Sequence, residues 1–474
     1  MNRAESAPTL VQHLASFAAE QRYESLPAAV RGDVPGRVLD VLGIAAAALD
    51  LDTSVAVADY VRESAGSPQA TAIGLAERVP AAQAALVNGT LAHSLDYDDT
   101  HLPSVLHPSA AVVPAALAAA ERSGANGRDL VAAVAVGLEV CVRVGMAGYD
   151  TAAGDSLYFA RGQHATSICG TLGGAAAAAL LSGLGAEGVA DAIGVAASMA
   201  SGIIEANRTG GTVKRIHCGW AAHAAVSAAE LVARGLTGPP SVFEGRFGFF
   251  QAFLDGRYDA TAITDGLGEE WAVPGIFYKP YPANHFTHCV ADAAISLRAR
   301  GVRAADIDAI HVGVAGPTVR TIGEPLAVKQ APQTGYQAQF SAPYVVAAAL
   351  LGGGGLGLSL GDFTDDLARD PQRRALMAKV TVGPDATCDE IYPYQFPAVV
   401  MVRLAGGEEI VEKVLTNRGG PDRPLNAGEL TEKFRENARR RFPESAVEAV
   451  RSRVDGLAEL DDMRALVAPF GEGR

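Results

Sequence analysis

Residues 93–101 place an unusual concentration of ionisable side chains between two alanine-rich apolar segments. They read HSLDYDDTH, and His-Pro-Ser follows at 107–109, so three carboxylates and three imidazoles lie within fifteen residues. An imidazole titrates near neutral pH and can give or take a proton, and a neighbouring carboxylate can orient it. The pattern therefore indicates a reaction centre that works by acid–base chemistry.

A metal site is the alternative use of this stretch, because several side chains of metal-binding types lie close together: His93, Asp96, Asp99, His101 and His107. The chain has neither an HExxH nor a CxxC pattern, and aspartate-rich loops often cap helices. We therefore expect no bound metal. Asp96 is expected to orient an imidazole or to contact a substrate hydroxyl group. Asp98 and Asp99 are expected to be loop or helix-capping residues.

Four basic side chains could supply the acid, the base and the positive charge of such a centre. His107 lies directly before Pro108, where an expected helix begins and favours bound anions, and its alternative role is to cap that helix. His164 opens another apolar helix, and its alternative is a hydrogen-bonded core histidine. Lys214 follows a glycine pair and Lys279 begins a proline-rich segment, and their alternative is an ordinary surface position.

These residue types suit one class of reaction. Removal of a proton from the carbon next to a carboxylate creates an enolate-like dianion, which needs a base that titrates near neutrality and fixed positive charge. Histidine can supply the base, and a lysine in a closed site is a strong point charge for a carboxylate. Arg215 and His217, close after Lys214, and His285, close after Lys279, are the second candidates.

Length and composition limit what this centre can serve. With 474 residues, 49% of them hydrophobic and only 19% charged, the chain is expected to be globular and to form two to three domains. Its formal net charge of −14 argues against nucleic acid or an anionic membrane as a partner. Five widely spaced cysteines and no signal-peptide pattern predict a cytoplasmic location. The uncharged run 165–186 is too rich in alanine and glycine for a membrane helix, so we expect a buried one.

Most of the chain reads as alanine-rich helices. Apolar residues occur without strand-like alternation from about 9 to 202 and again from 218 to 235, with short breaks at glycine or proline. So many small side chains favour helices that pack at close range. A charged amphipathic helix at 427–441 returns to this pattern near the end of the chain.

Between these parts the sequence changes character. A helical segment at 287–300 precedes several strand-like runs, and Ala-Gly-Gly at 405–407 predicts a hairpin between the last two. The strand-like runs lie at 307–314, 379–382, 399–404 and 409–415. We therefore expect a mainly α fold: a large all-helical domain built from residues 1–275 and 419–474, with a smaller inserted α+β domain at 276–418.

Six sequence blocks between residues 90 and 345 occur in the order found in one known family. They are AHSLDYDDT at 92–100 with HPS at 107–109, GQHAT at 162–166, KRIHCGWAA at 214–222, GLTGP at 235–239 with FEG at 243–245, KPYP at 279–282 with His288, and AQFS at 338–341 with Tyr344. On these blocks the chain resembles the MmgE/PrpD family. That family includes 2-methylcitrate dehydratase, cis-aconitate decarboxylase and iminodisuccinate epimerase.

The resemblance implies a helical domain with an α/β lid domain, a homodimer, and an active site in the cleft between the domains that works without a metal or an organic cofactor. A GxGxxG pattern at 352–357 follows a helical segment rather than a strand, so a dinucleotide site is not expected either. By position, five residues match those that the family uses around a small polycarboxylate: Asp96, His107, His164, Lys214 and Lys279. The further candidates for substrate binding are Thr100, Arg215, His217, Asn284 and His285.

Two positions depart from the pattern of the decarboxylase. Asn284, with His285 next to it, stands where that pattern has a histidine, and Thr321 stands at or near the position of a tyrosine. We therefore expect a hydro-lyase that resembles 2-methylcitrate dehydratase. The alternatives are decarboxylation of the cis-aconitate type, epimerisation of an amino- or iminodicarboxylate, and a non-catalytic binding protein that keeps the fold.

The expected mechanism divides the work between the lysines and the histidines. Lys214 and Lys279 bind carboxylates of the substrate, and His164 or His107 moves the proton on carbon. The other histidine, tuned by Asp96, assists the departure of hydroxide as water.

Overall fold

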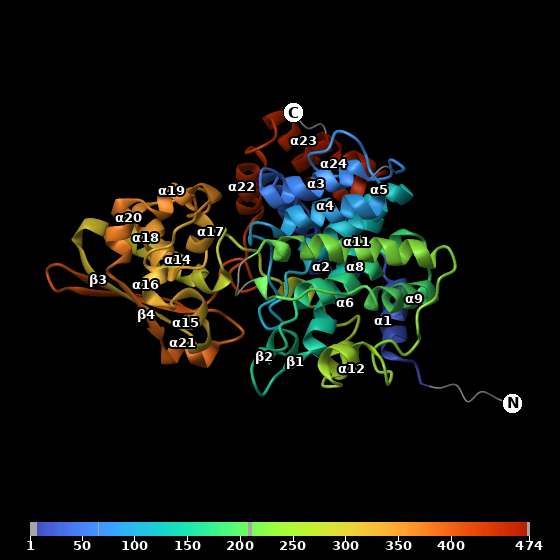
Figure 1. Ribbon diagram of the computed structural model, residues 1–474, viewed down its shortest axis with the longest axis horizontal. Coiled ribbons are helices and arrows are strands. Elements are labelled where there is room, and N and C mark those ends of the chain that lie inside the picture. Colours follow the sequence, from blue (N-terminus) through green and yellow to red (C-terminus); the bar gives the residue numbers. More distant parts are fainter. Residues whose placement is uncertain (1–6, 65, 207–210, 472–474) are drawn as a thin grey trace. The chain divides into compact units, whose positions relative to one another are not determined.

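The computed structural model describes residues 7–64, 66–206 and 211–471, and the chain folds into two compact units (Figure 1). A helical unit is formed by the chain up to Ile276 and again from Phe434 onward, and an α/β unit runs from Phe277 to Lys433. The fold is therefore mainly helical with an inserted α+β region, as the sequence predicts.

The second division between the units lies later in the chain than the sequence suggests. It falls after Lys433, whereas the sequence predicts it after residue 418. Charged contacts tie the intervening residues to the α/β unit: the Arg418 guanidinium donates to the Tyr281 hydroxyl group at 3.2 Å, and Arg423 pairs with Asp292 at 3.0 Å. Such long-range pairs leave no local pattern in the sequence.

Five apolar helices form the centre of the helical unit: α4 (Ala81–His93), α5 (Ser109–Ser123), α6 (Gly127–Ala147), α8 (Ala165–Leu181) and α11 (His217–Val232). Helix α8 packs against α5, α6 and α11, and α4 packs against α5 and α11. The run that the sequence predicts to be a buried helix is α8. Helix α6 is long and apolar enough to cross a membrane, but 94% of its apolar window is buried inside the unit, as in the core helix of a globular protein.

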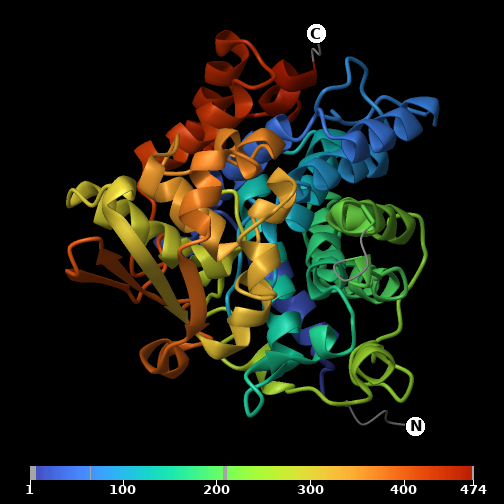
Figure 2. The ribbon, with the colours of Figure 1, turned by 60° about the vertical axis from the view of Figure 1, so that its left-hand side comes forward.

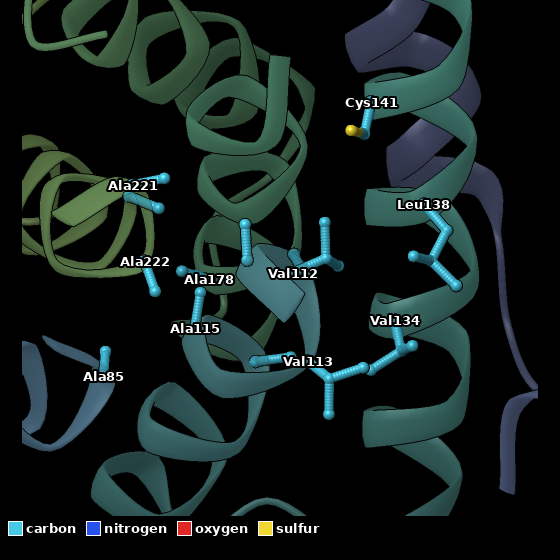
Figure 3. Close-up of a cluster of buried hydrophobic side chains, with 14 of the residues drawn as sticks. Ala85, Val112, Val113, Ala115, Val134, Leu138, Cys141, Ala178, Ala221 and Ala222 are labelled. Carbon is cyan, nitrogen blue, oxygen red and sulfur yellow. The ribbon is translucent and has the colours of Figure 1, made fainter. Parts of the chain in front are cut away.

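Small side chains let these helices approach closely. Alanines of α4, α5, α8 and α11 meet on one side of α5, and its valines face Val134 and Leu138 of α6 on the other (Figure 3). Where α8 meets α6, a Cβ atom on Gly173 would lie 2.3 Å from the carbonyl oxygen of Gly137. Only glycine fits there, because any larger residue would force the two helices apart.

The remaining elements of the helical unit surround this centre. They are α1 (Leu10–Glu20), α2 (Ala28–Ala47), α3 (Asp52–Glu63), β1 (Tyr149–Asp150), β2 (Asp155–Ser156), α7 (Leu157–Ala160), α9 (Ala186–Ala197), η1 (Val213–Ile216), α12 (Phe249–Leu254), α13 (Thr261–Thr264), η2 (Val273–Gly275), α23 (Glu444–Asp455), η6 (Leu457–Glu459) and α24 (Arg464–Gly471).

The α/β unit contains a four-stranded sheet in the order β4-β3-β5-β6. Its strands are β3 (Ile307–Val314), β4 (Val380–Pro384), β5 (Ala398–Leu404) and β6 (Glu409–Val414). Strand β3 is parallel to β4 and antiparallel to β5, and β5 and β6 form the predicted hairpin. All four strands confirm the predicted runs within a few residues.

Helices cover one face of this sheet (Figure 2). Helix α14 (His288–Ala299) packs on β5 and β6, and α18 (Ala342–Leu351) packs on α14 and β4. Alternate residues of β5, namely Ala398, Val400 and Val402, are buried, as expected for a strand with one covered face. The GxGxxG pattern directly follows α18, so no strand precedes it.

The other elements of the α/β unit are short, and α22 crosses the division between the units. They are η3 (His285–Thr287), η4 (Ala304–Asp306), α15 (Gly316–Ile322), α16 (Leu326–Lys329), α17 (Gly335–Ala338), η5 (Leu360–Asp362), α19 (Asp365–Ala368), α20 (Pro371–Met377), α21 (Ala386–Ile391) and α22 (Ala427–Ala438).

Candidate active site

The loop between α4 and α5 carries the ionisable stretch, and its backbone is tightly constrained. Asp96 has a φ of +52°, a conformation that aspartate tolerates, and Val105 has a φ of +54°, which is costly for a β-branched residue. A bridge between His101 and Leu106 closes the loop. The His107 backbone N–H then donates to the Thr166 hydroxyl group of α8 at 3.2 Å. The loop therefore reaches α8 in a fixed shape.

Asp99 anchors this loop to two helices. Its carboxylate accepts hydrogen bonds from the Ser109 backbone N–H at 3.2 Å and from the Ser109 hydroxyl group at 2.5 Å, at the start of α5. The Arg37 guanidinium of α2 lies 3.2 Å from the same carboxylate. Burial raises the pKa of Asp99 to about 6, although Arg37 acts to lower it. The predicted capping role of Asp99 is thus seen in the structure.

Four imidazoles from different elements lie side by side in the helical unit. The His93 ring, at the end of α4, has its centroid 5.5 Å from that of His107 and 5.4 Å from that of His164. The ring of His164, the N-cap of α8, lies 5.0 Å from that of His217, the first residue of α11. Histidines separated by up to 124 positions in the sequence (217 − 93) therefore share one buried cluster.

The imidazoles of His164 and His217 are held in their neutral forms. The Nδ1 atoms of His164 and His217 are 3.0 Å apart, so one donates and the other must carry a lone pair. Burial lowers the pKa of His164 well below its usual value, with smaller contributions from His93, Lys214, His217 and His107. Burial likewise lowers the pKa of His217 to about 4. At neutral pH both are thus bases rather than cations.

Lys214 brings positive charge to this cluster. It lies in η1, the short 3-10 helix that leads into α11, and its Nζ atom is 3.9 Å from the Asp96 carboxylate. The Lys214 side chain is 18% exposed, whereas that of Asp96 is 8% exposed. The ammonium group is also one of the charges that lower the pKa of His164. An anion that reached these imidazoles would therefore meet a cation.

The other candidate residues of the helical unit differ in whether their side chains contact the imidazole cluster. His107 is half-buried, and its Nδ1 lies 2.6 Å from the Asp99 carbonyl oxygen, so this nitrogen donates the hydrogen bond. The buried Thr100 hydroxyl group lies 3.4 Å from the same Nδ1. The Arg215 guanidinium donates instead to the Thr53 hydroxyl group at 3.4 Å, at the start of α3.

The remaining candidates belong to the α/β unit. Lys279 is buried, with 1% of its surface exposed. The Asn284 side-chain oxygen accepts from the Phe286 backbone N–H at 3.1 Å and thereby caps η3. The His285 ring is buried, with its centroid 5.6 Å from that of Phe396. Asn284 therefore has a structural role in addition to any contact with a ligand.

One pair of residues at the cluster was missed in the sequence. His93 is 3% exposed, and its Nδ1 lies 2.7 Å from the Asp98 carboxylate. Asp98 was expected to be a loop or cap residue, and the structure corrects this, because its carboxylate holds an imidazole. The turn at Asp96 folds the chain back so that Asp98 meets the last residue of α4. The five-residue spacing was visible, but the left-handed turn was not.

Among the described residues, one group could offer three metal ligands: His93, Asp98 and Cys218, whose ligand atoms lie within 4.8 Å of one another. Nδ1 of His93 and one oxygen of Asp98 are taken up by their mutual hydrogen bond, and burial raises the pKa of the Cys218 thiol well above its usual value. A protonated thiol beside a bonded pair fits a metal poorly.

The potential ligands considered in the sequence do not converge. His101 bonds to Ser104 at 2.7 Å, and Asp99 is taken up by Arg37 and Ser109. Burial lowers the pKa of His101 to about 4. A neutral His164 imidazole near the Lys214 ammonium group suits proton transfer next to a bound anion.

Comparison with known proteins covers most of the chain. Residues 12–261 match the MmgE/PrpD N-terminal domain, and residues 281–458 match the MmgE/PrpD C-terminal domain. The human cis-aconitate decarboxylase is 32% identical over 455 residues, which span 90% of this chain and 88% of that protein. The mouse cis-aconitate decarboxylase is 30% identical over 90% of this chain and 86% of its own. A 2-methylcitrate dehydratase from Cupriavidus necator is 28% identical over 52% of this chain and 51% of its own.

Proposed function

The chain belongs to the MmgE/PrpD family of enzymes, and we propose that it is a lyase that moves a proton at a carbon next to a carboxylate of a small polycarboxylate. One observation carries this proposal. Asp96, His164 and Lys214, which lie far apart in the sequence, meet in one buried cluster that joins a neutral base to a cation. This is the pairing that proton transfer beside a carboxylate requires.

Decarboxylation of a cis-aconitate-type substrate is the assignment that we favour. The relatives named as cis-aconitate decarboxylases from human and mouse each match 90% of the chain, whereas the 2-methylcitrate dehydratase matches 52%. This reverses the order expected from the sequence, where dehydration came first. Similarity along 90% of the chain outweighs the two single departures at Asn284 and Thr321.

In the proposed decarboxylation, Lys214 holds one carboxylate of an unsaturated tricarboxylate and His107 supplies a proton. The electron pair of the carbon–carbon double bond takes this proton and forms a new C–H bond. The bond to the leaving carboxylate breaks, its electron pair forms a new double bond, and CO₂ departs. His107 suits the donor role because it is half-buried and can regain its proton from solvent, whereas His164 is buried and neutral.

Asp96 and Lys279 complete this proposal. The Asp96 carboxylate lies 3.9 Å from the Lys214 ammonium group and is proposed to hold it in place for the substrate. Lys279 is proposed to bind a second carboxylate, as its position in the family pattern implies.

A hydro-lyase is the second candidate, and the neutral state of His164 favours it. A neutral imidazole can take the proton from carbon, after which the C–H electron pair forms the double bond and hydroxide leaves. His107 would protonate that hydroxide to water. Asn284 also fits a hydro-lyase. The decarboxylase pattern has a histidine at this position, whereas here the asparagine side chain caps η3.

The two reactions are separated by one experiment. The purified protein is incubated in deuterated water with cis-aconitate, 2-methylcitrate, citrate or an aminosuccinate and followed by NMR. Decarboxylation gives CO₂ and a product with one solvent deuteron, and dehydration gives an unsaturated acid without CO₂. A His107→Gln variant serves as the inactive reference for both reactions, and His13→Gln, at an exposed histidine of α1, is the matched control. The proposal would be refuted if none of the four compounds gave a product or exchanged deuterium with the solvent.

We also propose that the protein is a homodimer, as the family resemblance implies. Size-exclusion chromatography with light scattering would then give twice the chain mass of 48.8 kDa. A mass equal to that of one chain across the accessible concentration range would refute this.

A further inference from the structure

His93 occupies the middle of the imidazole cluster, although the proposed chemistry makes no use of it. Its ring is 3% exposed and lies between the rings of His107 and His164 at almost equal distances, 5.5 and 5.4 Å. Asp98 approaches it from the loop after α4, and Cys218 approaches it from α11. Few histidines are surrounded by so many ionisable groups without a role in their chemistry.

The hydrogen bonds of His93 define the state of its ring. The Nδ1 atom lies 2.7 Å from the Asp98 carboxylate, which can only accept, so Nδ1 carries the hydrogen. The Nε2 atom is buried and has no hydrogen-bond partner among the residues that the structure describes. A buried polar atom without a partner lowers stability, and its retention indicates a functional use.

We propose that Asp98 and His93 form a positioning pair for the reaction centre. Asp98 fixes the His93 ring, and His93 in turn positions the rings of His107 and His164. The catalytic consequence of this pair rests on the proposed function. Its effect on the titration of His164 does not depend on which reaction the protein catalyses.

The electrostatics of the cluster agree with this geometry. After burial, His93 is the largest contributor that lowers the pKa of His164, and it is also the largest after burial for His217. The other titratable groups at this place include the carboxylates of Asp96 and Asp98, the Cys218 thiol, the imidazoles of His107 and His217, and the Lys214 ammonium group. Of these, Lys214 and His107 act on His164 in the same direction as His93.

The test follows the titration of His164 directly and needs no substrate. Protein with isotope-labelled histidine rings is titrated by NMR, and the His164 signals are assigned from their loss in His164→Gln. In His93→Gln we expect the titration midpoint of His164 to rise, because the variant lacks the group that, after burial, does most to lower the pKa of His164. His223→Gln is the matched control, since His223 is also shielded but bonds to the Ala82 carbonyl oxygen outside the cluster. There the midpoint stays unchanged.

A kinetic readout distinguishes positioning from a role in stability alone. In Asp98→Asn the side chain keeps its shape but no longer fixes the hydrogen on Nδ1 of His93. We therefore expect kcat to fall roughly 10- to 100-fold with little change in KM. The thermal midpoint of the variant is measured alongside. Loss of kcat in proportion to loss of folded protein would assign the pair to stability instead.

Three results would overturn the inference. The first is an unchanged His164 midpoint in His93→Gln, or in His93→Asn if the former does not fold. The second is an equal change in the His223→Gln control. The third is a stoichiometric metal ion in the purified protein that disappears in Cys218→Ala, since the pair would then serve as ligands. Because the titration uses no substrate, its failure is separate from a failure to find turnover, which would refute the proposed function.

Discussion

Replacement of Lys214 by methionine tests the electrostatic part of the mechanism. Methionine keeps most of the side-chain volume and removes the charge. An ammonium group and a substrate carboxylate about 4 Å apart attract by about 4 kcal/mol at an effective dielectric constant of about 20. The Lys214 side chain is 18% exposed, so water screens part of this attraction, and we expect a loss of about 2 kcal/mol. This corresponds to a fall of about 30-fold in kcat/KM.

The same variant has a second expected effect and little cost in stability. Lys214 helps to lower the pKa of His164, so the limb of the pH–rate profile that reports His164 should move to higher pH in the variant. The ion pair with Asp96 is long and partly exposed, so its loss should change the free energy of unfolding by less than about 1 kcal/mol.

Steady-state kinetics from pH 5 to 9, with urea unfolding of each variant, measure these quantities. Arg234→Met is the matched control, because Arg234 is an exposed cation just beyond the end of the same helix, α11. Lys214→Arg should recover only part of the rate, since the guanidinium group keeps the charge but not the shape. A change of less than threefold in kcat/KM for Lys214→Met, or an equal loss in Arg234→Met, would refute the electrostatic argument.

The other predictions concern stability. Burial raises the pKa of Glu121 from 4.5 to about 7, so the stability that it contributes below about pH 4.5 is lost as pH rises through about 7. In Glu121→Gln, the decline in the free energy of unfolding over this pH range should be smaller by about 3 kcal/mol, as measured by urea unfolding. An equal decline with pH in both proteins would contradict this. Val105→Gly should raise the free energy of unfolding by about 1 kcal/mol, because it relieves a positive φ; destabilisation would show that the loop is not strained. Gly173→Ala should lower the free energy of unfolding by about 1 to 3 kcal/mol, because the added methyl group separates α6 from α8. Gly32→Ala in α2, where the added methyl group meets open space, should raise it by up to about 1 kcal/mol, and similar values for both variants would contradict the packing argument.

The fold was predictable where local chemistry decides it. Alanine-rich segments such as that of α8 form buried helices, and the alternation at 398–404 marks a strand with one covered face. The second end of the α/β unit was not predictable in the same way. It depends on Arg418 and Arg423, which reach Tyr281 and Asp292 more than 130 positions away.

The site was predictable in its residue types but not in its pairing. The sequence singles out Asp96 and His164, and the structure places both at one cluster. Asp98 was misjudged because its partner is set by the left-handed turn at Asp96, and no local pattern reports a dihedral angle. Arg215 looks equivalent to its neighbour in the sequence, yet its guanidinium group reaches Thr53.

The most direct measurement is the fate of cis-aconitate in deuterated water with the wild-type protein and His107→Gln. The account predicts that the wild-type protein releases CO₂ and gives a product with one solvent deuteron. It also predicts that His107→Gln, folded to the same extent, loses this activity by about 100-fold or more, because the proton donor is missing. Full activity in His107→Gln, or no CO₂ and no deuterium incorporation with the wild-type protein, would contradict the account.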